Sequence, residues 1–433
     1  MNTSIFYLSI FLIGITFLGI LPYSDAELIA STFFGSTSTG PVFVDVDASG
    51  NVYSLSKIHK DGWATTGAYS TSMTGNSDFI IAKFSPDLST LIASTYLSDG
   101  DISDNWQVDL MIDDSGDVIV LANANPQDIT LSLKQHDSND ATAIFIAKFS
   151  PDLSTLKGSA VIGGSSSDSS TSLEIDQQGN IIVAGLTQSS DFPTTPNAYD
   201  TTHAGSYEAV LAKFSPDLST LIASTFLGGT EYTRFNSILL DDENNIYLAG
   251  SVEDGNFPVT ADAYQPTFMP VGQFDGAISH LSSDLSTLIA STLIGGSSTE
   301  RIEGIAFDTL GNIVVSTLTP SNDYPSTTGA YQTTMIEGTN QAITKFSPDL
   351  SFTGSTNHVP TIISQDDFTD EDTSNTFSLV GNDRDGDQLT FSIIDQPSNG
   401  QISGTSPNFT YVPNSNFNGY DSFTFQANDG TSD

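Results

Sequence analysis

Short apolar runs separated by turn-forming residues recur along most of this chain. In one unit they cover residues 221–227, 236–240, 246–250 and 276–281, and Gly, Pro, Asn or Asp clusters bound each run. This pattern predicts four β-strands. The turn between the second and third runs is Asp241–Asn245, and other units carry Asp-x-x-Gly-Asn there, a hairpin in which Gly or Asn takes the positive φ. We interpret Asp45–Gly50 as one of these turns rather than as a metal-binding loop.

A second phrase, Lys-Phe-Ser-Pro-Asp-Leu-Ser-Thr in its fullest form, connects the units. Its aromatic or Leu position recurs about every 65 residues, at Phe84, Phe149, Phe214, Leu281 and Phe346. A unit that cannot bury its own apolar face must stack on its neighbours. Four antiparallel strands at a fixed period are typical of a β-propeller blade. We therefore predict an all-β propeller of about five four-stranded blades in domain 27–356, with repeats 27–90, 91–155, 156–220, 221–287 and 288–352.

Each unit also carries an insertion, marked in three units by an aromatic-Pro pair at Phe192, Phe257 and Tyr324. Because neighbouring strands alternate in direction, the insertions and the Gly-Gly turns are expected on one face, and the hairpins and connectors on the other. Loop-rich faces of repeat proteins commonly bind ligands. The insertion face is therefore the candidate binding face, although the repeated aromatic residues are expected to pack against their own blades.

The N-terminus reads as an export signal. An apolar run covers residues 5–21, and the small residues Ser24 and Ala26 follow it. We predict a signal peptide, 1–26, cleaved after Ala26; the alternative is an uncleaved anchor, because the segment has no Lys or Arg before the run. The chain has no Cys, so an exported protein would fold without disulfides.

Charge limits the partners. Eleven Lys and Arg stand against 52 Asp and Glu, a formal net charge of −41. Nucleic acid and anionic membrane surfaces are excluded as partners, since both need basic patches. Most of these acids are Asp, a residue of turns, caps and metal-binding loops. A solvated acidic surface is the simpler interpretation for most of them.

The repeated phrases resemble the prokaryotic family of SBBP propeller repeats. They run Asp-x-x-Gly-Asn, a strand ending Ala-Gly, Asp-Phe-Pro-Thr-Thr, and Ala-Lys-Phe-Ser-Pro-Asp-Leu-Ser, and residues 27–352 carry them. The name implies seven blades, whereas this chain shows five. The resemblance implies a secreted or cell-surface protein without shared catalytic residues, and so favours a scaffold over an enzyme.

Residues 357–433 follow a different pattern. Phrases such as Asn408–Pro413, 418–425 and Asn428–Gly430 resemble the cadherin-like, immunoglobulin-type repeat of large prokaryotic surface proteins. The resemblance implies a β-sandwich. Such repeats run one strand beyond the Asn-Asp-Gly turn, so we expect a truncated sandwich, or one completed by a strand from elsewhere.

This C-terminal region holds the best metal candidate. Asp383, Asp385 and Asp387 alternate around Gly386, so their carboxylates can converge on a hard cation such as Ca²⁺. Asp370 and Glu371 are the candidates to complete the ligand set. The alternative is an acidic hairpin turn without a metal.

The sequence lacks several common catalytic motifs. There is no thiol, no His-Glu-x-x-His, no phosphate-binding loop and no Gly-x-Ser-x-Gly. His280 replaces the connector Lys and is interpreted as a surface substitution, and Arg234 and Arg301, in equivalent Gly-Gly loops, are interpreted as pairing with surface acids.

We therefore expect a non-catalytic scaffold, extracellular or on the cell surface, that binds protein or glycan through the propeller loops in adhesion or surface-layer association. The alternative is an extracellular enzyme that acts on polysaccharide with carboxylates in the propeller channel. A cluster of acid, His, Arg or Tyr that does not repeat from blade to blade, facing the channel, would favour the enzyme.

Overall fold

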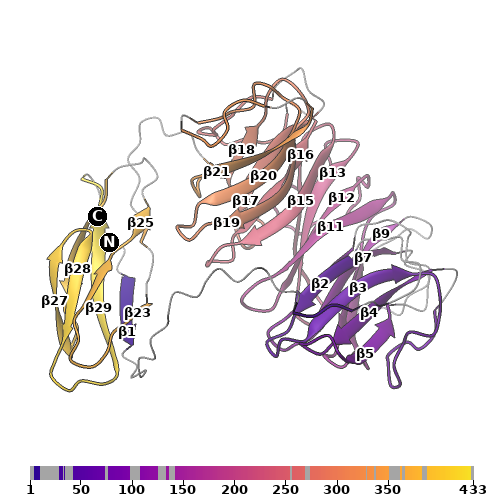
Figure 1. Cartoon of the computed structure of the whole chain (residues 1–433). Helices are drawn as coiled ribbons and strands as arrows, with labels where there is room; N and C mark the ends of the chain where they lie inside the picture. Colours follow the sequence, from indigo (N-terminus) through magenta and orange to yellow (C-terminus); the bar gives the residue numbers. More distant parts are fainter. Residues whose placement is uncertain are drawn as a thin grey trace. The chain divides into compact units, whose positions relative to one another are not determined.

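The computed structural model contains strands and no helix among the residues that it describes (Figure 1). The chain forms two compact units, one built mainly from residues 28–306 and 314–345, the other centred on residues 346–433. The structure describes residues 4–9, 29–32, 34, 42–73, 77–97, 108–124, 133–135, 142–253, 256–268, 274–327, 329–335, 338–350, 361–362, 366–382 and 388–430.

The repeats form five successive antiparallel sheets in the manner of propeller blades. The first sheet contains β2 (Val42–Val46), β3 (Val52–Ile58), β4 (Asp78–Phe84) and β5 (Leu91–Tyr96). The second contains β6 (Asp109–Ile112), β7 (Val118–Ala124), β9 (Ala143–Phe149) and β10 (Leu156–Ile162), with β8 (Leu133–Gln135) parallel to β10 at its edge. The third contains β11 (Asp168–Ile175), β12 (Ile181–Thr187), β13 (Glu208–Phe214) and β14 (Leu221–Leu227).

The last two sheets follow the same order. The fourth contains β15 (Thr233–Leu240), β16 (Ile246–Val252), β17 (Asp275–Leu281) and β18 (Leu288–Ile294). The fifth contains β19 (Arg301–Phe307), β20 (Ile313–Thr319) and β21 (Asn340–Phe346). The all-β fold of successive propeller-like sheets predicted from the sequence is thus confirmed, with three strands in the fifth sheet among the residues that the structure describes. The residue limits of the repeats stay a prediction.

The grouping of the strands into sheets is shifted by one strand relative to the sequence alignment. The run that the alignment places first in each unit, such as 221–227, is the fourth strand of the preceding sheet. The reason lies in the connectors, which are tight hairpins between the third and fourth strands: Ser215 donates its N–H to the carbonyl of Thr220, at 3.0 Å. In every connector the leucine takes a positive φ of 55–59°, at Leu88, Leu153, Leu218, Leu285 and Leu350.

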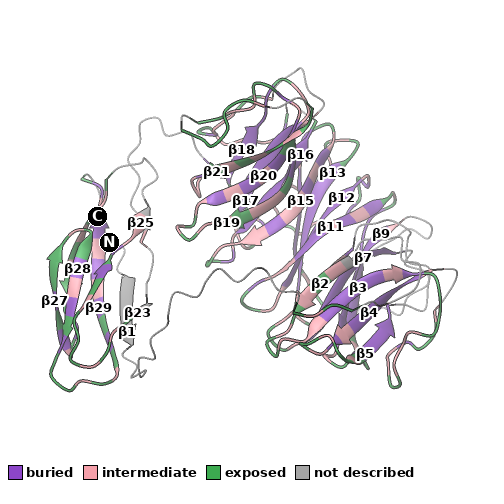
Figure 2. Ribbon diagram, viewed as in Figure 1, coloured by how far each residue is buried: buried purple, intermediate pink, exposed green. Residues whose placement is uncertain are grey.

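The hydrophobic core lies between neighbouring sheets (Figure 2). Val118 and Val120 of β7 pack in the cluster shared with the first sheet, whereas Ile119 and Leu121 pack in the cluster shared with the third. Alternate side chains of one strand point to opposite faces. A middle strand that is covered on both faces therefore needs a continuous apolar run, as the sequence shows.

The insertions and the Gly-Gly turns lie together, as the alternation of strand direction predicted. Ser165 donates its N–H to Asp191 of the insertion at 2.8 Å, and Ser297 makes the equivalent bond to Asp323 at 2.8 Å. Phe192 is buried against Phe226 of its own sheet, with ring centroids 6.1 Å apart. Packing of this insertion aromatic residue against its own blade is thus confirmed.

The C-terminal unit has a separate core around Phe377, Tyr411 and Phe425. Its strands are β22 (Thr361–Ile362), β23 (Asp366–Phe368), β24 (Asn375–Ser378), β25 (Gly381–Asn382), β26 (Thr390–Asp395), β27 (Gly400–Thr405), β28 (Asn408–Pro413) and β29 (Tyr420–Asn428). The strand β1 (Ser4–Ser9), within the expected leader, pairs antiparallel with β29 and parallel with β23. Cleavage after Ala26 stays a prediction. No helix in the described part of the chain is long and apolar enough to cross a membrane.

Candidate functional site

The first strands of neighbouring sheets lie side by side, β2 against β6, β6 against β11, and β11 against β15. Their side chains differ between sheets more than those of the connectors do. Asp45 and Glu174 each stand two residues before the Asp that opens the hairpin, where the other sheets carry Met111, Leu239 and Ala306. Polar side chains that replace apolar ones at equivalent positions are the feature that distinguishes a site from a repeated structural contact.

A third acid joins these two. Asp109 precedes Met111 by two residues on β6, and therefore points to the same face of the strand. Asp45, Asp109 and Glu174 are all half-buried, and each comes from the first strand of a different sheet. We call these three residues the carboxylate cluster. It is a non-repeated group of acids on three adjacent inner strands.

Backbone N–H groups orient the two aspartates. Asp45 accepts hydrogen bonds from Val46 at 2.7 Å and from Ile112, in the next sheet, at 2.7 Å. Asp109 likewise accepts from Leu110 at 2.8 Å and from Leu173, one sheet further on, at 3.1 Å. Each carboxylate is therefore fixed by its own strand and by the neighbouring sheet.

Glu174 is held more loosely. Its Oε2 accepts one long hydrogen bond, 3.4 Å, from the N–H of Ile175. Burial raises the pKa of Glu174 to about 7, and the nearby charges of Asp109 and Asp45 add to this effect. Burial also raises the pKa of Asp109 to about 6, with a contribution from Asp45. Glu174 and Asp109 therefore keep their protons to a higher pH than ordinary carboxyl groups do, a property that suits a proton donor in acid–base catalysis.

A pocket of about 400 Å³ lies at the first strands of the fourth and fifth sheets. Arg234 of β15 and Arg301 of β19 line it, together with Tyr232 and Phe274. Arg301 lies over the Phe274 ring, with Cζ 5.5 Å from the centroid. The structure thus places Arg301 against an aromatic ring. We call this the arginine pocket.

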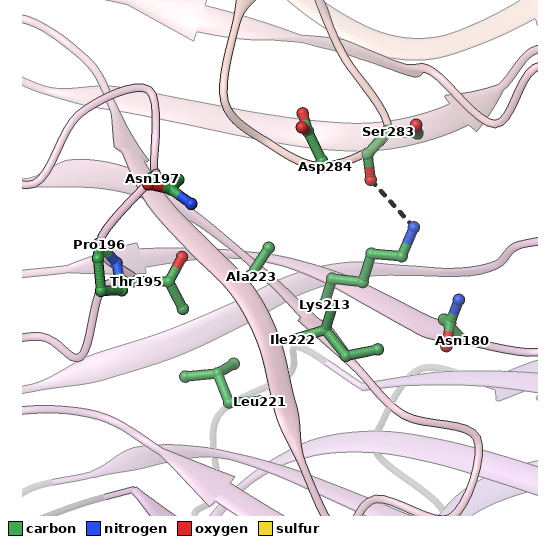
Figure 3. Close-up of a pocket in the computed structure, with 10 residues that line it drawn as sticks. All are labelled: Asn180, Thr195, Pro196, Asn197, Lys213, Leu221, Ile222, Ala223, Ser283 and Asp284. Atoms are coloured by element: carbon green, nitrogen blue, oxygen red, sulfur yellow. Dashed lines mark hydrogen bonds between the residues drawn. The ribbon is translucent and has the colours of Figure 1, made fainter.

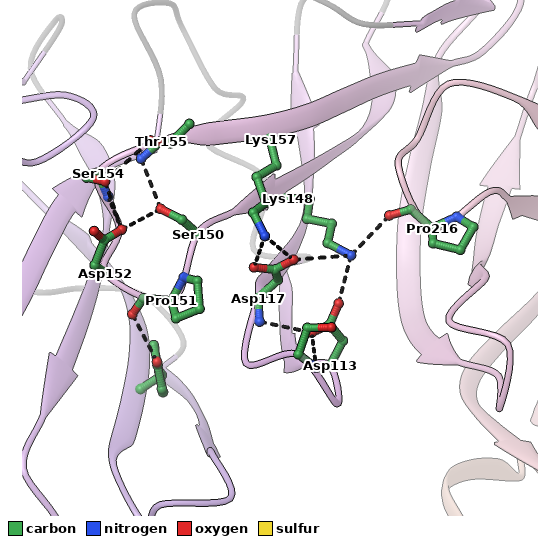
Figure 4. A network of polar contacts seen from close by, with 12 residues as sticks. Asp113, Asp117, Lys148, Ser150, Pro151, Asp152, Ser154, Thr155, Lys157 and Pro216 are labelled. Atoms are coloured by element: carbon green, nitrogen blue, oxygen red, sulfur yellow. Dashed lines mark hydrogen bonds and ion pairs between the residues drawn. The ribbon is translucent and has the colours of Figure 1, made fainter.

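A second pocket, of about 570 Å³, lies between the third and fourth sheets (Figure 3). Its one cationic side chain, Lys213, is 2.8 Å from Asp176 and donates to the carbonyl of Ser283 at 3.0 Å. These contacts repeat in other sheets. Lys148 lies 2.7 Å from Asp113 and donates to the carbonyl of Pro216 at 3.1 Å (Figure 4). The lysine is therefore structural, and this pocket is the weaker candidate.

The interpretation of His280 as a surface substitution is wrong. Only 8% of its surface is exposed, and the ring stacks on Tyr247 with centroids 3.9 Å apart. Burial lowers the pKa of His280 to about 4, although Asp241 at 3.6 Å opposes this effect. His280 is thus neutral at pH 7 and occupies the buried position of the connector lysine.

The residues of Asp45–Gly50 belong to two different parts of the structure, a strand and a turn. Asp47 does form the predicted turn, accepting from Ser49 at 3.0 Å and from Asn51 at 2.9 Å. Asp45, which we had included in the turn, belongs instead to β2 and to the carboxylate cluster. Comparison of equivalent positions among the repeats is the signal that would have separated the two aspartates.

The calcium candidates are only partly placed. Asp383, Asp385 and Asp387 lie outside the described residues. Asp370 is exposed and Glu371 half-buried in the turn after β23. Within the ranges that the structure describes, no three His, Cys, Asp or Glu side chains are arranged to hold a metal ion. The calcium site therefore stays a prediction.

The fold and the comparisons together define an all-β, propeller-like protein with a C-terminal immunoglobulin-like domain, since residues 357–433 match a family model described as a bacterial Ig domain. The comparisons do not show the SBBP family. A search of curated proteins found no match.

Solved structures with similar folds include an alpha-L-arabinofuranosidase from Fusarium graminearum, with 12% identity, covering 86% of this chain and 92% of its own, at a TM-score of 0.38. An endo-arabinase from Bacteroides thetaiotaomicron has 13% identity, 71% and 94% coverage and a TM-score of 0.32. An ulvan lyase, a polysaccharide lyase, has 11% identity, 85% and 91% coverage and a TM-score of 0.32.

These findings contradict our expectation of a non-catalytic protein, because the similar structures are an arabinofuranosidase, an endo-arabinase and an ulvan lyase, all of which are enzymes. At such low identity the likeness concerns the fold alone. Any activity of this chain has to be argued from its own side chains, and the carboxylate cluster is a group of acids that does not repeat from sheet to sheet.

Proposed function

We propose that this chain is an extracellular enzyme that cleaves a polysaccharide at the carboxylate cluster. The observation that supports it is the set of three acids on β2, β6 and β11, of which Glu174 and Asp109 have raised pKa values. Hydrolysis of a glycosidic bond uses one carboxylic acid as proton donor and a second carboxylate as base or nucleophile. The cluster offers both forms near neutral pH.

The roles follow from the contacts. Glu174 has one weak backbone hydrogen bond and retains its proton to about pH 7, so it is the candidate acid that protonates the leaving oxygen. Asp45 is the candidate partner, because two backbone N–H groups orient its carboxylate. The glycosidic C–O bond breaks as Glu174 protonates the leaving oxygen, a water oxygen forms the new bond to the sugar carbon and gives a proton to Asp45, and exchange with solvent returns the proton to Glu174.

The proposal also includes the expectations about export, the C-terminal domain, the partner and calcium. A cleaved leader would export the enzyme, and the immunoglobulin-like domain would space it from a surface or bring it to its substrate. Glycan is then the partner of the protein. The resemblance to SBBP repeats describes the scaffold that carries the site, and Ca²⁺ at Asp383, Asp385 and Asp387 would stiffen the C-terminal domain.

The test is cleavage of a panel of neutral and acidic polysaccharides by the full chain, followed as new reducing ends. We expect Glu174→Gln to lower kcat by about 100- to 10,000-fold. Asp45→Asn should have an effect of the same order. Glu243→Gln, in an exposed hairpin of the fourth sheet, is the matched control and should change nothing.

Each alternative outcome counts against the proposal. Cleavage that survives Glu174→Gln would place the active site elsewhere. A well-folded protein that cleaves none of the polymers would reject the enzyme itself.

A further inference from the structure

Arginine is rare in this chain. Three residues, Arg234, Arg301 and Arg384, provide all of it, in a protein with a formal net charge of −41. Two of the three line the arginine pocket. Two guanidinium groups close together are unusual in a chain with so few basic residues, and they form a local positive charge on an acidic protein.

The fold places these two arginines at equivalent points of adjacent sheets. Each stands five residues after the second glycine of a Gly-Gly turn, on or at the start of a first strand. The side chain of Asn236 on β15 donates to the carbonyl of Ile302 on β19 at 2.8 Å, and so joins the two strands. The third sheet has Ser169 at the equivalent position. The pair is therefore a feature of the last two sheets and is not part of the repeat.

Aromatic rings continue from the pocket across the fourth sheet to the third. Tyr207 and Tyr232 have ring centroids 5.8 Å apart, and Tyr232 and Phe274 have centroids 5.5 Å apart. Tyr207 is exposed, whereas the other two rings are half-buried. Such a row offers apolar surface to successive rings of a chain-like ligand, and the pocket at its end has the size and the mixed lining of a small-ligand site.

The polar groups of the pocket set its charge. Glu303 contributes one carboxylate against two guanidinium groups, so the lining carries a net positive charge. Ser251 pairs with Arg234 across β15 and β16, and its hydroxyl is buried without a hydrogen-bond partner in the protein. A buried hydroxyl of this kind gains from a ligand that can complete its bonding.

We propose that the arginine pocket binds the anionic group of an acidic sugar residue, with the row Tyr207, Tyr232 and Phe274 supporting the neighbouring sugar rings. The guanidinium fork matches the geometry of a carboxylate or a sulfate ester. This inference rests on the proposed function and names its substrate class, an acidic polysaccharide. Because the rest of the protein repels anions at long range, recognition has to be made by contact within the pocket.

The test is calorimetric binding to the full chain carrying Glu174→Gln, so that no probe is cleaved. The probes are a short oligogalacturonate, which carries carboxylates, a sulfated carrageenan oligosaccharide, and a neutral arabino-oligosaccharide. We expect at least tenfold tighter binding of one anionic probe than of the neutral one, and the preferred probe identifies the carboxylate or the sulfate.

Variants assign the binding to the pocket. Arg301 is exposed, so Arg301→Ala should keep the thermal melt and weaken binding of the anionic probe at least tenfold, with Arg301→Lys in between. Lys60→Ala removes one positive charge at an exposed position of the first sheet and should have no effect. Equal affinity for neutral and anionic probes, or binding unchanged in both Arg301→Ala and Arg234→Ala, would overturn the inference.

The two proposals fail in different ways. Cleavage that depends on Glu174 but is indifferent to Arg301, in both kcat and KM, would reject the acidic substrate and keep the enzyme. Arginine-dependent binding of an acidic sugar by a chain that cleaves none would reject the enzyme and keep the pocket.

Discussion

The connector side of the sheets and their first strands differ in whether their polar contacts repeat from sheet to sheet. On the connector side the contact repeats: Lys83, Lys148 and Lys213 each lie within 3.3 Å of a hairpin aspartate of their own sheet and donate to a carbonyl of the next. On the first strands the polar residues change from sheet to sheet. Contacts that hold the sheets together have to recur at every junction, whereas a site for one ligand is needed once.

The largest expected effect tests the repeated contact. Lys148→Met should lower the free energy of unfolding by about 3 kcal/mol, because it leaves the carboxylates of Asp113 and Asp117 buried without this partner. Urea denaturation measures the change, with Lys60→Met, at an exposed position, as control. Equal losses in the two variants would mean that the lysine contributes nothing specific.

Calcium binding would extend the comparison to the C-terminal domain. If the predicted site is real, Ca²⁺ at 100 times its Kd should stabilise that domain by about 2.7 kcal/mol. Thermal melts in chelator and in Ca²⁺ measure this effect, which Asp385→Ala should remove and Asp242→Ala, in a hairpin of the fourth sheet, should not. Identical melts with and without Ca²⁺ would reject the site.

The pH dependence of stability tests the carboxylate cluster apart from catalysis. The pKa of Glu174 rises from 4.5 to about 7 on folding, so the folded chain holds this proton longer than the unfolded chain. The folded state consequently loses stability as the pH rises from about 4.5 to about 7. Glu174→Gln should match the wild type at pH 4 and exceed its stability by on the order of 2 kcal/mol at pH 8. The same difference at both pH values would show that burial does not raise this pKa.

The smallest effect concerns the junction where the repeated contact is missing. His280→Lys should raise stability by about 1 kcal/mol at pH 7, because a lysine can reach Asp241 and can lie over Tyr247 as Lys83 lies over Tyr53, 4.8 Å from its centroid. Chemical denaturation is sufficient to measure it, with His280→Ala expected to be destabilising. A destabilised lysine variant would show that His280 is fitted to this place and does not merely replace the lysine.

Much of the fold could be predicted from the sequence, because continuous apolar runs and Asp-Gly-Asn turns report local structure directly. The assignment of each strand to its sheet could not be predicted, because the connector hairpin depends on a leucine at positive φ. No pattern of hydrophobic residues reveals that conformation. The site was harder still. Arg234 and Arg301 were noticed for their type, whereas Asp45 and Asp109 were hidden among many aspartates and Glu174 was not singled out. Their significance depends on strands from three sheets lying side by side.

The connector leucines bear on how such an array can be rebuilt. A non-glycine residue at positive φ is strained, yet the side chains of Leu153, Leu218, Leu285 and Leu350 are fully buried, and Leu153 and Leu285 accept backbone hydrogen bonds from Tyr69 and Tyr199 of the preceding sheet. Glycine at these positions would relieve the backbone strain but would remove the buried leucine side chain. An engineer who adds a sixth sheet should therefore keep the connector between its third and fourth strands intact, because the buried leucine of that connector bonds the new sheet to the preceding one.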